Sequence, residues 1–348
     1  PEARMGVAMT DWIDHLFADA RVVELRHAVD GRWTCGTFDD AGLLRAEVER
    51  RGGTGNLYTT INAPAATGAA NAMRGQPLRD VDIGHHVRLP FDFDPVRPAD
   101  CASTKAELGA AVAARDRLVI ALSALGWPAP AVAISGNGAH AVYRCRFRVS
   151  PESREVLTVL YRGLGSDFGA DSVRFDTAVR NPARVWRLYS TTNRKGKPTA
   201  DRPHRLAAVR IPQQWRPVGL RDVEALANRY ARRPRPAPSP AESASVRLPP
   251  GDGDYRSLDV VDWFAGRSLY RRPLGNGMHA VRCPWDHEHS TVDDEHSTAT
   301  VIWEAHGHCW PNFRCLHAHC DGRGIRDVLA ALGDADRYCA RTFERGAA

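Results

Sequence analysis

Two aspartates separated by one residue stand in a stretch that alternates polar and bulky apolar side chains. In residues 86–95, HVRLPFDFDP, Asp92 and Asp94 alternate with Phe91 and Phe93. This alternation predicts a half-buried strand, on which both carboxylates point the same way about 7 Å apart at the backbone. Two like charges on one face repel, and a divalent cation removes that repulsion because hard cations take carboxylate oxygens. The stretch therefore indicates a cation site; a polar strand end running into a proline-rich turn is the alternative.

A glycine-containing turn lies between two strand-like segments, residues 131–135 and 140–147. The turn, SGNGAH, spans residues 135–140. Its glycines allow positive φ, and a tight turn can point backbone N–H groups inward toward an anion. The candidates for holding phosphate oxygens are Ser135, Gly136, Asn137 and His140. A hairpin turn with an incidental histidine is the alternative.

A third carboxylate, Asp176, follows a short predicted strand over residues 172–175. From residue 174 to 210 the sequence holds ten Lys or Arg against two Asp. Arg184 and Arg187 stand among Val, Trp and Leu, which suggests partly buried arginines, and a buried arginine needs an anion partner. An Arg fork binds phosphate in a bidentate manner, whereas Lys195 would act as a point charge. A solvated basic surface is the alternative.

Together, three carboxylates, a phosphate-binding turn and a basic strand describe a nucleotidyl-transfer site. Two Mg²⁺ or Mn²⁺ ions bridged by Asp92, Asp94 and Asp176 would activate a 3′-hydroxyl and stabilise a pyrophosphate leaving group. His140 and the arginines would grip the triphosphate.

These stretches resemble, in order and at plausible spacing, the motifs of the archaeo-eukaryotic primase superfamily, in particular the bifunctional primase/polymerases of phages and plasmids. The three motifs are the Asp-x-Asp strand, the turn ending at His140, and the Asp176 stretch with 181–184, NPAR. The resemblance covers roughly residues 20–220. It implies a catalytic core with an RRM-like sheet and divalent-metal-dependent nucleotide polymerisation.

The resemblance also implies roles for individual residues. Asp92, Asp94 and Asp176 would bind metal and His140 would contact nucleotide phosphates, with Arg184, Arg187 and Lys195 as further triphosphate contacts. The family commonly has Lys at the position of Arg187 and Gly at that of Ser190, and both departures keep charge or small size. Asn62 also matches a family position near the nucleotide.

Cysteine and histidine crowd together near the C-terminus. Eight of the fourteen histidines fall between His279 and His319, and the chain shows no export signal, so zinc is favoured over disulfides. Two ligand pairs flanking a strand-like segment, residues 298–304, can close a tetrahedral site. The Cys-Pro and Phe-x-Cys contexts are similar to zinc-binding elements of phage and bacterial primases. The predicted ligands are Cys283, His289, Cys315 and Cys320, with His287, His317 and His319 as rivals; a metal-free, histidine-rich surface is the alternative.

The remaining pattern predicts an α+β protein. Helices are expected over residues 11–18, 40–51, 103–125 and 150–163, and further strands over 22–29, 32–37 and 56–62. The predicted division is a primase/polymerase catalytic domain (1–231), a Pro/Arg-rich linker (232–254) and a small zinc-binding α/β domain (255–348). In the last domain we expect helices over 257–265, 324–332 and 334–343.

The 348-residue chain carries a formal charge of +6, which mildly favours a polyanionic partner. Because no apolar run approaches the roughly 20 residues of a membrane span, we expect a cytoplasmic protein without membrane contact. No GxxxxGK[ST] motif occurs, so a replicative helicase motor would belong to a partner or to a longer parent chain.

The leading interpretation is a DNA primase/polymerase that uses NTPs or dNTPs, Mg²⁺ or Mn²⁺ and Zn²⁺ on a single-stranded DNA template, in phage, plasmid or other mobile-element replication. The alternatives are a non-catalytic replication initiator on a primase-like scaffold and a metal-dependent nuclease. The intact set of Asp92, Asp94 and Asp176 argues against the first. The turn at 135–140 and the triphosphate-type arginines argue against the second.

Overall fold

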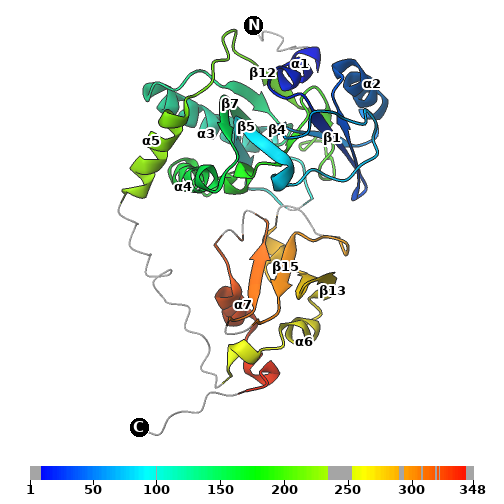
Figure 1. The fold of residues 1–348 in the computed structure, drawn as a ribbon, viewed down its shortest axis with the longest axis vertical. Helices are drawn as coiled ribbons and strands as arrows, with labels where there is room; N and C mark the ends of the chain where they lie inside the picture. Colours follow the sequence, from blue (N-terminus) through cyan, green and yellow to red (C-terminus); the bar gives the residue numbers. More distant parts are fainter. Residues whose placement is uncertain are drawn as a thin grey trace. The chain divides into compact units, whose positions relative to one another are not determined.

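The structure is a computed structural model that describes residues 9–98, 100–233, 253–289, 294–306, 309–317, 320 and 322–341. The chain divides into two compact units, residues 1–233 and 234–348, each described here by itself (Figure 1). Helices and antiparallel sheets occur in both units, so the predicted α+β class is confirmed. Among the described residues, no helix combines the length and the hydropathy that crossing a bilayer requires.

Two antiparallel sheets form the frame of the first unit. The first sheet has the order β2-β1-β3-β9, and the second has the order β12-β6-β7-β5-β4 with β8 paired to β5. The first comprises β1 (Val23–Val29), β2 (Arg32–Phe38), β3 (Asn56–Thr60) and β9 (Val185–Arg187). The second comprises β4 (Ala63–Pro64), β5 (Ile83–Pro95), β6 (Ala131–Ile134), β7 (Ala139–Arg148), β8 (Val173–Phe175) and β12 (Ala208–Arg210). A short ribbon pairs β10 (Thr192–Asn193) with β11 (Arg205–Leu206).

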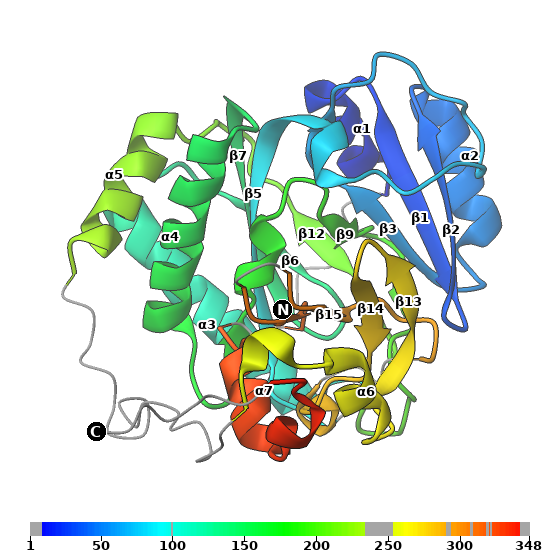
Figure 2. The same ribbon diagram turned by 60° about the horizontal axis from the view of Figure 1, so that its bottom comes forward.

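Helices pack on both sheets (Figure 2). They are α1 (Met9–Asp19), α2 (Ala41–Arg51), α3 (Lys105–Ala124), α4 (Pro151–Phe168) and α5 (Leu220–Ala231). The expected helix starts are confirmed, because Asp40 caps α2 and Thr104 forms a capping box with Glu107 at α3. The fourth helix ends at Phe168 rather than near residue 163, and α5 was not predicted.

Strand β5 joins the core to the polar pocket. Phe91 and Phe93 are fully buried, and both rings lie within 6 Å of Phe175 on β8. Because successive side chains of a strand point to opposite faces, the two aspartates between and after them, Asp92 and Asp94, leave the core. The alternation predicted for this stretch is confirmed.

A buried ion cluster ties α1 to the central strands. Arg88 on β5 is completely buried, and its guanidinium donates to Asp19 at the end of α1 over 2.9 Å. Arg144 on β7 reaches the other oxygen of the same carboxylate at 2.5 Å. Burial lowers the pKa of Arg88 to about 10, so the cation persists at neutral pH and depends on this partner.

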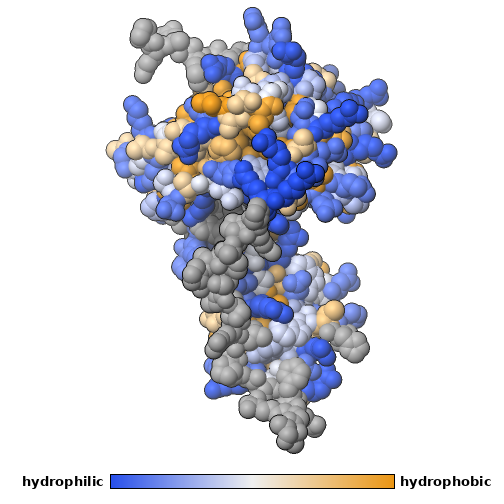
Figure 3. Space-filling model, turned by 90° about the vertical axis from the view of Figure 1, so that its left-hand side faces the viewer, coloured by the Kyte–Doolittle hydropathy of each residue, from blue (hydrophilic) through white to orange (hydrophobic). Residues whose placement is uncertain are grey.

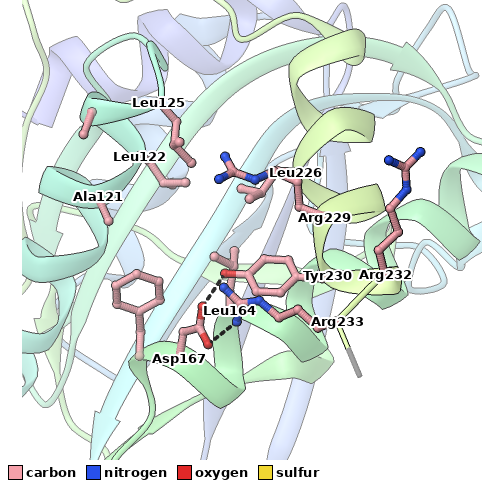
Figure 4. Close-up of a pocket in the computed structure, with 12 residues that line it drawn as sticks. Ala121, Leu122, Leu125, Leu164, Asp167, Leu226, Arg229, Tyr230, Arg232 and Arg233 are labelled. Atoms are coloured by element: carbon pink, nitrogen blue, oxygen red, sulfur yellow. Dashed lines mark hydrogen bonds and ion pairs between the residues drawn. The ribbon is translucent and has the colours of Figure 1, made fainter. Parts of the chain in front are cut away.

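On the side of α3, α4 and α5 the surface of this unit carries an apolar patch (Figure 3). Between the helices lies a groove of 630 Å³. Leu122 and Leu125 of α3 face Leu226 of α5 across it, with Tyr230 and Arg233 both bonded to Asp167 at its edge (Figure 4). Beside this groove, α5 packs against α4.

The second unit is an antiparallel meander, β13-β14-β15-β16, with short helices. Its elements are a 3₁₀ turn (Tyr255–Ser257), α6 (Val260–Ala265), β13 (Tyr270–Gly275), β14 (Met278–Val281), β15 (Thr300–Trp303), β16 (Asn312–Cys315), α7 (Ile325–Leu332) and a 3₁₀ turn (Ala335–Tyr338). The predicted helix 257–265 was too long, because Asp259 caps a helix that begins at Val260. The predicted helix 334–343 was wrong over the described residues, which form one 3₁₀ turn there.

The proposed linker also needs a boundary correction. The Gly253 N–H bonds the Asp336 carboxylate at 2.9 Å, so Gly253 and Asp254 pack within the second unit. Residues 234–252 of that segment lie outside the described residues.

The ion cluster yields a stability prediction. Asp19→Asn should lower the free energy of unfolding by about 3 kcal/mol, because it leaves buried Arg88 without its counter-charge. Asp14→Asn is the matched control, since Asp14 pairs with Arg45 at the surface and exposed pairs contribute about 0–1 kcal/mol. Urea titration of both variants measures the difference, and equal effects would contradict the assignment.

Candidate active site and metal centre

A pocket of 140 Å³ lies between the two sheets of the first unit. Tyr58 on β3 and Trp186 on β9 line it from the first sheet, and Asp92 on β5 and His140 on β7 line it from the second. It gathers most residues predicted from the sequence, namely Asp92, Asp94, Ser135, Asn137, His140, Asp176, Arg184, Arg187 and Lys195. Gly136 belongs to the same turn but does not line the pocket.

Strand pairing brings the three carboxylates together. Asp92 is the register partner of His140 on β7, and Phe93 is the partner of Phe175 on β8. The N–H of Asp176 bonds the carbonyl of Asp92 at 2.9 Å, directly after β8 ends. Residues 84 positions apart thus become neighbours, and their carboxylates share one pocket.

The carboxylates interact unfavourably. Burial raises the pKa of Asp176 to about 6, Arg184 opposes this shift, and the charge of Asp92 adds to it. Burial and the neighbouring Asp92 also raise the pKa of Asp94. The Asp94 side chain nevertheless stays 42% exposed, so solvent or an ion can reach it. Both shifts indicate that this site favours a lower negative charge than three ionised carboxylates provide.

The arginines nearest to Asp94 and Asp176 lie beyond hydrogen-bond distance and compensate the negative charge only in part. Arg97 lies 3.6 Å from Asp94, and Arg184 lies 3.9 Å from Asp176. The Oδ1 atom of Asp92 is buried and accepts no hydrogen bond from the described residues, although the Nε2 atom of His140 is 3.4 Å away. A buried acceptor among undercompensated carboxylates fits a hard divalent cation, which would take these oxygens as ligands.

The glycine turn lets the backbone approach β5 closely. Gly136 has φ +95°, and a Cβ atom on Gly138 would lie 2.6 Å from the Phe93 carbonyl oxygen and 2.9 Å from an Asp94 carboxylate oxygen. The Gly138 N–H donates to the Ser135 hydroxyl at 2.9 Å, so it is used inside the turn. The turn therefore brings its backbone against the Asp94 carboxylate, and Ser135 remains beside the pocket.

A buried tyrosine orients His140. The indole N–H of Trp186 donates to the Tyr189 hydroxyl oxygen at 2.8 Å, and that hydroxyl lies 2.9 Å from Nδ1 of His140. Burial raises the pKa of Tyr189, so its proton stays in place and can be donated to Nδ1. Nε2 of His140 then carries the ring proton and faces Asp92 and the pocket.

Arg187 is buried without a carboxylate. It is 5% exposed. Its guanidinium donates to Asn56 and Tyr58, both at 2.9 Å, and to Asn193 at 3.2 Å. Within the described residues, neutral oxygens hold the guanidinium and no carboxylate pairs with it, so the predicted phosphate contact stays a prediction. Burial lowers the pKa of Arg187, and an arriving anion would relieve that cost.

Several pocket residues were missed from the sequence. Asn193 accepts from the Lys195 N–H at 3.0 Å and donates to the Ser135 carbonyl at 2.7 Å, which joins the turn to the basic strand. Arg97 could have been found from the sequence, because it stands only three residues after Asp94. By contrast, Asn62 does not line the pocket, because its amide bonds the backbone of Val87 and Pro182. Ser190 has φ +64°, which explains why glycine suits that position.

The second unit holds a compact ligand cluster. One ligand atom each from Cys283, His289, Cys315 and Cys320 lies within 4.8 Å of all the others. The Cys283–Cys320 sulfur distance is 3.6 Å, and Nε2 of His289 is 3.4 and 3.7 Å from the sulfurs of Cys320 and Cys315. A zinc tetrahedron with its usual bond lengths has edges of about 3.8 Å between sulfurs and about 3.5 Å between sulfur and nitrogen. The predicted ligands thus come together with the dimensions of a zinc site.

The rival histidines lie around this cluster. His317 stacks on His289 with ring centroids 3.9 Å apart, and its Nδ1 is 3.2 Å from the Cys315 sulfur. His287 is exposed beside Glu288, and His319 lies outside the described residues. Thr300 donates to the Cys315 sulfur at 3.2 Å, which would stabilise a thiolate and orient it toward a metal.

Comparisons with solved structures find primases and polymerases. The AEP domain of the cyanophage S-2L primase-polymerase is 17% identical, with a TM-score of 0.37, and covers 63% of this chain and 96% of its own. Primase RepB′ is 14% identical, with a TM-score of 0.39, over 64% of this chain and 62% of its own. The polymerase domain of Ligase D from Mycobacterium tuberculosis, in complex with DNA, is 14% identical, with a TM-score of 0.36, over 65% and 88%.

Each of these likenesses is distant, so the function has to be argued from the residues of the site. No protein-family model matches the chain, and no curated protein matches it.

The carboxylate pocket predicts an unusual dependence of stability on pH. The native state holds the Asp176 proton up to a pKa of about 6, against 3.8 for an unperturbed carboxyl. Without a divalent cation in the pocket, this group therefore lowers stability as pH rises from 4 to 6 and keeps it lower above that range.

Asp176→Asn should remove this effect and keep the cap bond from the Ala178 N–H. Thermal melts without added Mg²⁺ should show the variant more stable at pH 7.5 by about 3 kcal/mol, and the gap should close by pH 4. Added Mg²⁺ should stabilise the wild type more than the variant. A gap that is constant with pH would contradict the shifted pKa.

The sulfur–histidine cluster predicts zinc-dependent folding of the second unit. Cys315→Ser should lower zinc content and unfold residues 253–341, because small metal sites couple binding to folding. Residues 9–233 should keep their own transition in hydrogen exchange. Cys339→Ser is the control, since Cys339 is not in the cluster. Equal zinc content in both variants, measured by atomic absorption, would argue against the site.

Proposed function

We propose that the protein is a DNA-dependent nucleotidyltransferase, a primase or polymerase that joins nucleotides on a single-stranded DNA template. The observation that carries the proposal is a single pocket lined by three carboxylates and by phosphate-binding side chains, His140, Arg187 and Lys195 among them. Undercompensated carboxylates suit cations, and a buried arginine held by neutral groups suits an anion. A nucleotide with its metals supplies both charges at once.

The pocket residues divide the work of the reaction. Asp92, Asp94 and Asp176 would hold Mg²⁺ or Mn²⁺, which when bound lowers the pKa of a 3′-hydroxyl and neutralises charge on pyrophosphate. His140 donates from Nε2 to a phosphate oxygen, because its other nitrogen is engaged by Tyr189. Arg187 binds phosphate without reorganising, since Asn56 and Tyr58 already fix its guanidinium.

The second unit would bind zinc through its tetrad and assist the template. A closed site of four protein ligands is structural rather than catalytic, and it would stabilise a small fold. We assign catalysis to residues 1–231, and, with the corrected boundary, zinc binding to 253–348 and linkage to the segment between them. The protein would serve phage, plasmid or other mobile-element replication, with a helicase motor supplied by a partner or a longer parent chain.

Two other functions remain as outcomes of the test. A nuclease could use the same carboxylates, but it has less need of a buried anion-binding arginine beside them. A non-catalytic initiator has no need of three neighbouring aspartates in a pocket where burial and the charge of Asp92 raise the pKa values of Asp94 and Asp176. The charge arrangement therefore favours nucleotidyl transfer.

Synthesis on labelled primer–template and on unprimed single-stranded DNA tests the proposal, with NTPs or dNTPs and Mg²⁺ or Mn²⁺. The wild type should lengthen DNA, and the Asp92→Asn/Asp94→Asn double variant should lose activity by roughly 10³ or more. Asp201→Asn is the control, because Asp201 is exposed and away from the pocket. Shortened DNA without nucleotides would indicate a nuclease, and unchanged DNA would indicate an initiator.

A further inference from the structure

One face of the first sheet carries a row of stacked side chains that leads to the pocket. Tyr58 is the register partner of Arg187 on one side and of Arg26 on the other. Trp33, two residues from the partner of Arg26, points to the same face because side chains alternate along a strand. The row Trp33–Tyr58–Arg187 therefore crosses the sheet from its edge strand β2 to β9.

The contacts along this row are close. The rings of Trp33 and Tyr58 have centroids 5.4 Å apart at 33°. The Arg187 guanidinium carbon lies 4.3 Å from the Tyr58 ring centroid. Tyr58 is thus held between an indole and a cation that lines the carboxylate pocket, which fixes the position of the indole relative to that pocket.

Trp33 itself remains largely uncovered. It is 54% exposed, whereas Leu25 and Leu57 on the opposite face are fully buried. Beside it lies an open hollow of 650 Å³, bounded by Trp33, Arg26, residues 73–77 and Val185. Val185 also lines the carboxylate pocket, so the two spaces adjoin.

The mixed polar and apolar lining of the hollow suits a nucleobase. The hollow is lined by polar Thr34 and Gln76 together with apolar Met73 and Pro77, so it offers apolar surface to the face of a ring and polar groups to its edge. Arg74, on its rim, is exposed and has no carboxylate within 4 Å among the described residues. A broad aromatic ring beside a free cation is the arrangement that stacks bases and contacts the phosphates between them.

We propose that Trp33 is a stacking platform for an unpaired base of a single DNA strand at the entrance of the carboxylate pocket, with Arg74 contacting the backbone of that strand. The inference rests on the proposed function for the identity of the strand, as the template being copied. The platform itself is defined by strand binding, which is measured without metal or nucleotide.

Fluorescence anisotropy with a labelled twelve-residue oligo(dT) and the full chain tests the platform. Trp33→Ala should weaken binding about tenfold, since stacking one base on an aromatic ring contributes about 1–3 kcal/mol. Trp33→Phe should retain most of the affinity. Ile120→Ala is the control, because Ile120 is also an exposed apolar side chain, at 69%, and lies on α3, which packs against the second sheet. Thermal melts should be unchanged in all three.

Salt dependence separates stacking from charge. Trp33→Ala should leave the slope of log Kd against log salt unchanged, whereas Arg74→Ala should reduce its magnitude by about 1. Equal binding by wild type and Trp33→Ala, or equal losses in Trp33→Phe and Trp33→Ala, would overturn the platform.

A second arm titrates dTTP with Mg²⁺ into the wild type and Trp33→Ala. A loss confined to dTTP would assign the indole to the incoming nucleotide and overturn the strand assignment. Primer extension by the wild type reports the proposed function independently. Oligonucleotide binding that depends on Trp33 in a protein without synthesis would retain the platform and reject the polymerase.

Discussion

Repulsion among Asp92, Asp94 and Asp176 is the constraint to which the first unit responds. Three carboxylates share a pocket that raises the pKa of Asp94 and of Asp176. Strand pairing holds them there, through the bond from the Asp176 N–H to the Asp92 carbonyl. The core below, with Phe91 and Phe93 fully buried, supplies the free energy that keeps this arrangement folded. The carboxylate pocket is thus maintained by apolar packing on the other side of one strand.

The basic side of the pocket is built differently. Arg187 and His140 are positioned by neutral partners, the amide of Asn56 and the hydroxyls of Tyr58 and Tyr189. A carboxylate partner would hold an arginine equally well but would cancel its charge. Neutral partners fix the geometry and leave the charge for a ligand, which is the condition for electrostatic preorganisation. Among the described residues, the carboxylates therefore lack sufficient positive charge, and Arg187 lacks a negative partner. Both sides belong to one pocket, which β5, β7 and β9 line.

Local chemistry made much of this site predictable. The alternation with phenylalanine indicates that Asp92 and Asp94 share one face, and the capping box of Thr104 and Glu107 indicates the start of α3. The zinc-type tetrad was predictable because few functions other than metal binding explain Cys and His residues at such spacing. What escaped prediction depends on long-range pairing. The contact of Tyr58 with Arg187 spans 129 residues, and that of His140 with Tyr189 spans 49, so no local pattern encodes either. Helix α5 escaped because its apolar face, Val223 and Leu226, is short and stands next to proline-rich sequence.

The alternation along strand β5 links correct strand register to correct assembly of the pocket. Its even-numbered positions 92 and 94 carry the chemistry, and its odd-numbered positions 91 and 93 carry the core. A slip of one residue in its pairing would exchange the two faces, placing phenylalanines in the pocket and aspartates in the core. Such a molecule could neither pack nor bind a cation. A register error that disrupts the pocket therefore also destabilises the fold, so the packing of the core selects the register that forms the pocket.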